Sequence, residues 1–315
     1  MIAYIIRRLL LVIPTLLIST ILIFSMIHFI PGDPAAVMLG DTATEAQVEM
    51  LREKMGLNEP YLIQYFKWIT RSLKGNLGES IFAHSQVLYV IRVRAETSIF
   101  VALFSMILII VIGVSIGVIS ALKYNSFLDQ SLMGIAMFGA SIPTFCSGLL
   151  FMFIFAVHLG WLPTSGFPGV LSNGNFSNFR YLILPCVTLA IPNTALIIRL
   201  TRSTMLDVAK EDYVRTAKAK GLTNSKVNIR HILRNALIPV ISALGFIFVG
   251  LMSEAVVTEN VFALPGLGQL IVQSILRRDY PVIQGIVLIV VLVYMLINLF
   301  IDILFVYLDP RIKYY

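Results

Sequence analysis

Six long stretches without Asp, Glu, Lys or Arg constrain the fold of this sequence more than any other feature. A helix needs about 20 apolar residues to cross the roughly 30 Å of hydrocarbon in a bilayer. The chain is also 58% apolar, with a mean hydropathy of +0.88, which lies outside the range of soluble domains. The sequence therefore predicts an all-α membrane protein with six transmembrane helices. The stretches are Leu9–Ile30, Thr97–Leu122, Gln130 to about His158, Tyr181–Ile198, Asn235–Ser253 and Tyr280–Ile301.

The third stretch is ambiguous in length, because it continues without charge to Arg180. Gly and Pro residues after Trp161 are typical of a loop that leaves the membrane, so we expect one helix there and not two. Pro143 is expected to bend this third helix, and Pro185 and Pro192 the fourth. Small residues suited to close helix packing occur in the second to fourth stretches. They are the G-x-x-x-G pair Gly113 and Gly117, with Gly134, Gly139, Ser141 and Gly148.

Basic residues predict that both ends of the chain are cytoplasmic. An even number of spans puts the termini on one side, and short connections rich in Lys and Arg face the cytoplasm. Arg7 and Arg8 precede the first span and Lys123 follows the second, while Arg311 and Lys313 close the chain. The start of the chain is predicted to be an uncleaved span, because its apolar run is longer than that of a signal peptide.

This topology divides the chain into four parts. Residues 1–30 form an N-terminal transmembrane helix, and residues 31–96 an extracytoplasmic insert. Residues 97–308 form a core of five helices that includes the loop 199–235, and residues 309–315 are a cytoplasmic tail.

The insert contains two segments with helix-capping signals. "TEAQVEMLREKMG" has Thr44 before an acidic first turn and Gly56 at its end, and "NEPYLIQYFKWITRSLKG" has Asn58 as a cap and Gly75 as a stop. They predict two short amphipathic helices. Two roles stay equally open for them: a lid on the membrane surface, or a docking site for an external partner.

The loop 199–235 concentrates the charge of the protein. It holds nine Lys or Arg residues and three acidic ones, so it carries +6 of the net charge of +7. Topology explains that sign, but the segment also has the features of a helix, with a possible Glu211–Arg215 pair and basic residues in the last turn. Gly221 favours a left-handed end, and a second helix is expected from Thr223 or Ser225. Apolar residues alternate with the charges, which favours a protein-docking elbow over a face that binds lipid.

Other polar residues in the spans give weaker signals. Glu254 lies near the outer end of the fifth span and Asp302 near the inner end of the sixth, where structural pairing is favoured over proton coupling. Cys146 and Cys186 lie inside spans and are interpreted as small packing residues. Neither a catalytic constellation nor a metal-binding cluster is predicted.

At this point the sequence resembles a known family. "RTAKAKG" followed by "HILRNALIP" is similar to the E-A-A-x-x-x-G loop of permease subunits of bacterial ABC importers, with Arg215, Thr216 and Ala217 at the E-A-A positions and Gly221 as the glycine. "PGDP", "ENVFALPGLGQL", "RRDYPVIQG" and "NLFIDILFVYLDPRI" resemble the first permease of the dipeptide, oligopeptide and nickel branch. The resemblance extends nearly from end to end.

This resemblance implies the type I importer permease fold in a bacterial inner membrane, with an ATPase-coupling site in the elbow. The implied partners are a second homologous permease, two cytoplasmic ATPases, an extracytoplasmic substrate-binding protein and membrane lipid, without nucleic acid. ATP would be bound by the partner subunits, because this chain lacks a phosphate-binding loop and needs no cofactor of its own. The predicted site residues are Glu211, Asp212, Tyr213, Arg215, Thr216, Ala217, Lys218, Ala219, Lys220, Gly221 and Leu222.

Short peptides are the expected cargo, and the protein is expected to be a transport subunit without enzymatic activity. A nickel or metal-chelate permease is the alternative within the family. An ion-coupled carrier would require paired charges near the middle of the membrane and inverted repeats, and neither is evident.

Overall fold

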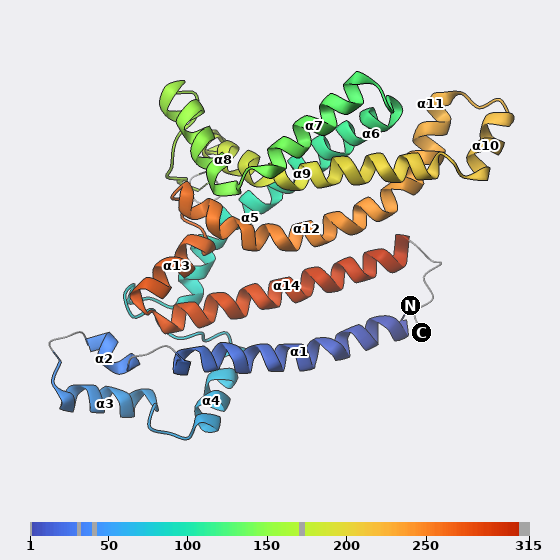
Figure 1. The fold of residues 1–315 in the computed structure, drawn as a ribbon. Coiled ribbons are helices and arrows are strands. Elements are labelled where there is room, and N and C mark those ends of the chain that lie inside the picture. Colours follow the sequence, from blue (N-terminus) through green and yellow to red (C-terminus); the bar gives the residue numbers. More distant parts are fainter. Residues whose placement is uncertain (1, 30–32, 40–42, 170–173, 309–315) are drawn as a thin grey trace. The chain divides into compact units, whose positions relative to one another are not determined.

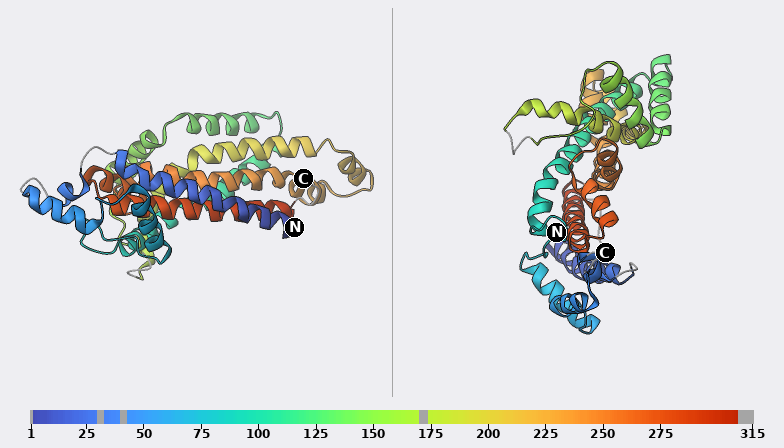
Figure 2. Two further views of the ribbon diagram at one scale, coloured as in Figure 1. Left: turned by 90° about the horizontal axis from the view of Figure 1, so that it is seen from below. Right: turned by 90° about the vertical axis from the view of Figure 1, so that its left-hand side faces the viewer.

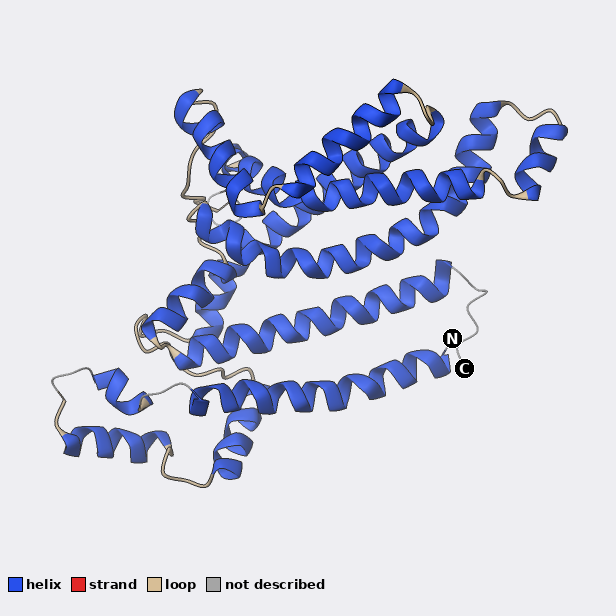
Figure 3. Ribbon diagram, in the orientation of Figure 1, coloured by secondary structure: helices blue, strands red, loops and turns tan. Residues whose placement is uncertain are grey.

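The computed structural model describes residues 2–29, 33–39, 43–169 and 174–308. Every named element in this part of the chain is a helix, and its β structure is a single isolated bridge between Glu79 and Gln86 (Figure 3). The chain divides into two compact units. The first unit contains residues up to Ala95 together with Gln269–Leu299, and the second contains Glu96–Gly268 together with the residues from Phe300 onward.

Four helical stretches of the described chain are long and apolar enough to cross a membrane, and a bent pair of helices makes a fifth. This confirms an all-α protein with several spans. The first predicted span lies in α1 (Ile2–Phe29), where the apolar segment Leu10–Ser25 is shorter than the other stretches. The four long apolar stretches are Val87–Leu122, Phe176–Val208, Asn224–Val261 and Tyr280–Ile303.

The predicted bend at Pro143 is confirmed, and it is sharp enough to divide the expected third helix into two. The stretch forms α7 (Phe127–Ser141) and α8 (Thr144–Phe151), which continues as π-helical turns over Met152–His158, and the two parts meet at 100°. Ile142 is extended (ψ 124°), because the ring of the following Pro143 disfavours a helical conformation at the preceding residue. Pro185 and Pro192, in contrast, lie inside the single helix α9 (Arg180–Val208).

The first unit holds the predicted insert with its two capped helices. Thr44 and Gln47 form a reciprocal capping box at the start of α3 (Glu45–Met55), and Gly56 ends this helix with φ 72°. The helix α4 (Tyr61–Leu73) begins after Pro60 and has no side-chain cap, so the predicted role of Asn58 was wrong. The Asn58 amide donates instead to Glu49. The other elements of this unit are α2 (Pro34–Leu39), the start of α5 (Val87–Leu108), most of α13 (Leu267–Arg277) and α14 (Tyr280–Leu308) up to Leu299.

A buried carboxylate holds the insert to the C-terminal part of the same unit. The Ser80 hydroxyl donates to Asp279 Oδ2 at 2.6 Å, and the Ile81 amide donates to Asp279 Oδ1 at 3.3 Å. Asp279 is 4% exposed, so these bonds are shielded from water. The contact joins residues almost 200 positions apart in the sequence.

The second unit is built around α9 and α12 (Arg234–Val261), which pack side by side (Figure 1). Gly113 and Gly117 lie directly against α9, which confirms the packing role of this pair. A Cβ atom on Gly113 would lie 2.7 Å from Ile197 Cγ2, and one on Gly117 would lie 2.6 Å from Thr201 Cβ. The other helices of the unit are the π-helical segment Ile109–Val114, α6 (Ser115–Leu122), α10 (Asp212–Ala219) and α11 (Asn224–Lys226).

A buried ion pair joins α7 to α9 in this unit. Arg202 donates through Nε to Asp129 Oδ1 at 2.7 Å and through Nη2 to Asp129 Oδ2 at 2.8 Å. The Asp129 side chain is only 2% exposed and also accepts hydrogen bonds from the Ser120 hydroxyl and the Asn125 amide. The Arg202 guanidinium lies 5.2 Å from the centre of the Tyr124 ring. One carboxylate therefore ties together the end of α6, the turn that follows it, and α9.

Another buried carboxylate of the second unit, that of Glu259, explains the glycines of the "PGLGQL" motif. Glu259 is fully buried and accepts hydrogen bonds from the Ser98 hydroxyl at 2.6 Å and from the Gly268 amide at 2.7 Å. A Cβ on Gly266 would lie 2.2 Å from Glu259 Cδ, and a Cβ on Gly268 would lie 2.4 Å from Val256 Cα. Only glycine leaves room for this carboxylate at the start of α13.

The close approach of α6 to α9 can be tested at Gly117. We expect Gly117→Ala to destabilise the protein by about 1–3 kcal/mol, because the new methyl group overlaps Thr201 and the Ile198 carbonyl. Gly134→Ala is the matched control, since no atom lies within 4 Å of its added Cβ. The measurement is the thermal unfolding midpoint of the purified protein in detergent; equal midpoints for the two variants would contradict the packing.

The Asp129–Arg202 pair leads to a separate prediction. Asp129→Asn leaves the Arg202 charge without its bidentate partner, so we expect a loss of about 3–5 kcal/mol. Asp207→Asn removes an exposed partner of Lys210, 3.5 Å away, and is expected to cost less than about 1 kcal/mol. Denaturant unfolding of both variants gives the comparison, and a small effect of Asp129→Asn would show that the pair does not anchor the unit.

Candidate functional site

The charged elbow, defined as Glu211–Leu222, lies at one end of the second unit. Its helix α10 and the following α11 extend beyond the adjacent ends of α9 and α12 (Figures 1 and 2). The first part of the predicted cytoplasmic loop 199–235 belongs to α9, which continues as a helix to Val208. The elbow therefore follows shortly after the end of a long helix.

The predicted order of helix, glycine turn and helix is present. Gly221 has φ 78° and follows Lys220 at the end of α10, which confirms the left-handed glycine. The next helix begins at Asn224 after Thr223 and continues through π-helical turns over Val227–Leu233 into α12. The elbow is thus joined to α12 without an irregular break.

The expected pair between Glu211 and Arg215 is replaced by another. Arg215 Nη1 lies 3.7 Å from Asp212 Oδ1, three residues earlier, while Glu211 precedes the helix as its cap residue. The side chains of Arg215 and Asp212 are 76% and 97% exposed, so the pair contributes little to stability. Both charges stay available to a partner.

The apolar residues of α10 form a small core of their own. Val214 is fully buried and Ala217 is 6% exposed, and they cluster with Met205 of α9 and with Val227 and Ile232 of the π-helical segment. The Ala217 side chain thus packs on the inner side of the elbow. The other ten predicted site residues are exposed.

A polar cluster fastens α10 to the beginning of α12. The Asn235 amide donates to the Tyr213 hydroxyl at 2.7 Å and to the His231 carbonyl at 3.2 Å. The Tyr213 hydroxyl donates to the same carbonyl at 3.4 Å. Because Tyr213 is 41% exposed, its ring also contributes to the outer surface. The elbow is therefore a packed element that can transmit force to α9 and α12.

Glu254 has a partner that the sequence did not reveal. Asn193, in the middle of α9, donates from Nδ2 to Glu254 Oε2 at 3.1 Å, and Glu254 is exposed. In the sequence, only the position of the polar residue Asn193 beside Pro192 pointed to this contact, and that is a weak signal. Among the residues that the structure describes, no group of three His, Cys, Asp or Glu side chains is placed to hold a metal ion.

Comparison with known proteins assigns most of the chain to characterised sequence families. Residues 113–314 match the family described as binding-protein-dependent transport system inner membrane component, and residues 1–86 match the N-terminal family of the same membrane components. A solved structure described as an inward-facing conformation of the MetNI methionine ABC transporter has a similar fold, with a TM-score of 0.57 and 18% identity. The match covers 70% of this chain and 97% of that one.

Curated relatives align along the whole chain. A probable peptide ABC transporter permease of Sinorhizobium fredii is 41% identical, with 99% of each chain covered. The dipeptide transport system permease DppB of Alkalihalophilus pseudofirmus is 41% identical, and the glutathione transport system permease GsiC of Pectobacterium atrosepticum is 42% identical, with 100% of each chain covered in both. With the membrane-spanning helices of the structure, these matches show that the chain belongs to the binding-protein-dependent transport system inner membrane component family and is a permease subunit of an ABC importer.

Proposed function

We propose that this permease carries short peptides across a bacterial inner membrane together with a second homologous permease. The observation that carries the proposal is the similarity to three relatives: proteins about 40% identical along their full length are named for peptides, dipeptides and glutathione, which is itself a tripeptide. An extracytoplasmic binding protein delivers the cargo. No specific feature of the structure favours the nickel or metal-chelate alternative.

The proposed topology has six spans and two cytoplasmic termini, which places the elbow in the cytoplasm. The distribution of Lys and Arg supports this orientation, since the segment from Arg199 to Asn235 holds nine of the 24 basic residues. The α1 segment Leu10–Ser25 and the bent α7–α8 pair count as one span each.

The elbow is proposed to dock on one of two ATPase subunits, which bind ATP in place of this chain. Its exposed basic residues and the ring of Tyr213 supply the contact surface, and its buried residues keep that surface fixed relative to α9 and α12. Closure of the ATPases would push on the elbow and tilt both helices. Such rigid-body motion changes the side on which a transport path is open.

Peptide uptake is the direct test of the function. The permease, its partner permease, the two ATPases and the binding protein are reconstituted in vesicles with labelled dipeptides and tripeptides. We expect ATP-dependent accumulation that stops when the binding protein is omitted. Uptake of a nickel chelate without uptake of any peptide would contradict the proposed cargo.

Gly221 provides a test of coupling with a matched control. Gly221→Val forces a β-branched residue into a left-handed conformation and is expected to distort the end of α10, although no atom lies within 4 Å of the added Cβ. Gly75→Val meets the same conditions in the insert, with φ 80° and equally open space. We expect Gly221→Val to lower peptide-stimulated ATP hydrolysis by about tenfold, a loss of roughly 1.4 kcal/mol in coupling, while Gly75→Val leaves it unchanged. Equal stimulation in the two variants would exclude the elbow as the coupling element.

A further inference from the structure

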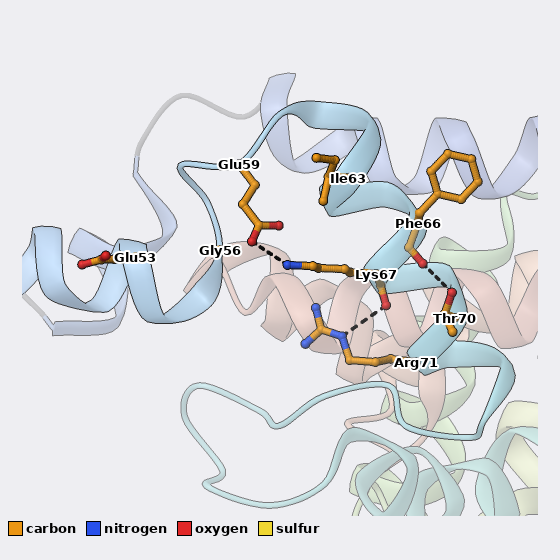
Figure 4. Close-up of a pocket in the computed structure, with 8 residues that line it drawn as sticks. All are labelled: Glu53, Gly56, Glu59, Ile63, Phe66, Lys67, Thr70 and Arg71. Carbon is orange, nitrogen blue, oxygen red and sulfur yellow. Dashed lines mark hydrogen bonds and ion pairs between the residues drawn. The ribbon is translucent and has the colours of Figure 1, made fainter.

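The insert of the first unit contains a pocket of about 700 Å³. It lies between the end of α3 and one face of α4. Figure 4 shows the Lys67 side chain directed toward Glu59 in the loop that enters this helix. The lining residues are Glu53, Gly56, Glu59, Ile63, Phe66, Lys67, Thr70 and Arg71.

The pocket is held beside the last third of α1. The Phe24 ring packs edge-on against Tyr61 and Tyr65, with ring centres 5.2 and 5.7 Å apart, and lies 5.8 Å from Trp68. The hydroxyls of Thr20 and Tyr65 are hydrogen bonded at 2.9 Å. Thr20 lies nine residues before the end of α1 at Phe29, or about 14 Å along the helix axis. If α1 crosses the membrane, α4 therefore lies at the depth of the lipid headgroups and the first acyl carbons.

The three faces of α4 suit this depth. At about 100° per residue, the α1-facing side chains Tyr61, Tyr65 and Trp68 share one face of the helix. An exposed apolar stripe, formed by Leu62, Phe66 and Leu73, lies about 110° away from it. These three residues are 66%, 63% and 82% exposed. Lys67 and Arg71 lie on the side opposite this stripe, which is the arrangement of a helix that lies in the membrane interface.

Exposed apolar side chains on α1 also indicate a lipid environment. Leu17 and Ile18 are 53% and 59% exposed, and Leu22, two residues before Phe24, is 61% exposed. A soluble partner would leave this α1 surface and the α4 stripe as two separate apolar patches. Lipid covers both at once.

The charges of the pocket are only partly paired. Lys67 Nζ lies 2.5 Å from Glu59 Oε1, whereas the other oxygen, Oε2, is buried and has no hydrogen-bond partner among the described residues. Arg71 donates through Nε to the Lys67 carbonyl at 3.2 Å, and no carboxylate in the described part of the chain pairs with its guanidinium. The pocket thus offers an acceptor for a cation beside donors for an anion.

We propose that this pocket binds the headgroup of a zwitterionic aminophospholipid from the bilayer around α1. The ammonium group donates to the carboxylate of Glu59, whose side chain is 34% exposed, the phosphate accepts from Arg71 and Lys67, and an acyl chain lies along Ile63 and Phe66. Phosphatidylethanolamine has these groups. The inference rests on α1 crossing the membrane, as in the proposed topology, and is independent of the transported cargo.

Lipid retention by the intact complex tests the site. The full-length permease is purified with its partner subunits in detergent, mixed with equal amounts of phosphatidylethanolamine, phosphatidylcholine and phosphatidylglycerol, and analysed by native mass spectrometry. We expect phosphatidylethanolamine to be retained about tenfold over the other two lipids, because only its headgroup combines an N–H donor with a phosphate. Equal retention of the three lipids would overturn the proposal.

Three variants separate the contributions of the headgroup. Glu59→Gln is expected to lower the retention of phosphatidylethanolamine to that of phosphatidylcholine, and Arg71→Gln to lower the retention of both lipids. Lys74→Gln, at the residue that follows α4 and outside the pocket lining, is expected to change neither. Unchanged lipid retention in both pocket variants would overturn the proposed site. Displacement of the lipid by a soluble dipeptide would also overturn it, because the pocket would then be a peptide site. Thermal unfolding of each variant confirms that the fold is intact, and peptide uptake measured in parallel tests the transport function separately.

Discussion

The buried ion pair between Asp129 and Arg202 determines how the second unit presents its functional end. A carboxylate that is 2% exposed is stable in an apolar bundle only when its hydrogen-bonding capacity is filled, and Asp129 receives donors from Arg202, Ser120 and Asn125. These partners come from α6, the turn after it, and α9. Arg202 also lies only six residues before the end of α9 at Val208. The pair therefore fixes the part of α9 from which the charged elbow projects.

In the elbow, unlike at the buried ion pair, the charged side chains lie on the outside and the apolar side chains on the inside. Val214 and Ala217 are buried in a cluster with residues of α9 and of the segment that leads into α12. A lipid-binding helix would instead expose such residues as one continuous apolar stripe, as α4 does with Leu62, Phe66 and Leu73. The two amphipathic helices thus differ in where their apolar faces go. This difference agrees with the two proposed roles, docking on a partner protein for the elbow and lying in the membrane interface for α4.

Features encoded by neighbouring residues could be predicted from the sequence, whereas contacts between distant residues could not. The apolar stretches, the capping box at Thr44 and the left-handed Gly221 were all recognisable, since each depends on a few adjacent positions. The Asp129–Arg202 and Ser80–Asp279 contacts join residues 73 and 199 positions apart, and no local pattern specifies them. A local pattern failed at Asn58, which was predicted to cap α4. Its side chain donates to Glu49 instead, and α4 has no side-chain cap.

Glu254 and Asn193 indicate how the second unit is oriented in the membrane. Both residues lie in membrane-spanning stretches, they are hydrogen bonded at 3.1 Å, and the carboxylate is exposed on the surface of the unit. A charged side chain is costly in hydrocarbon and is normally turned toward protein or water. Gly250, one turn before Glu254 on α12, has no atom within 4 Å of an added Cβ, so this surface is also open. We therefore expect the face of α9 and α12 that carries these residues to be turned toward protein or water and away from lipid.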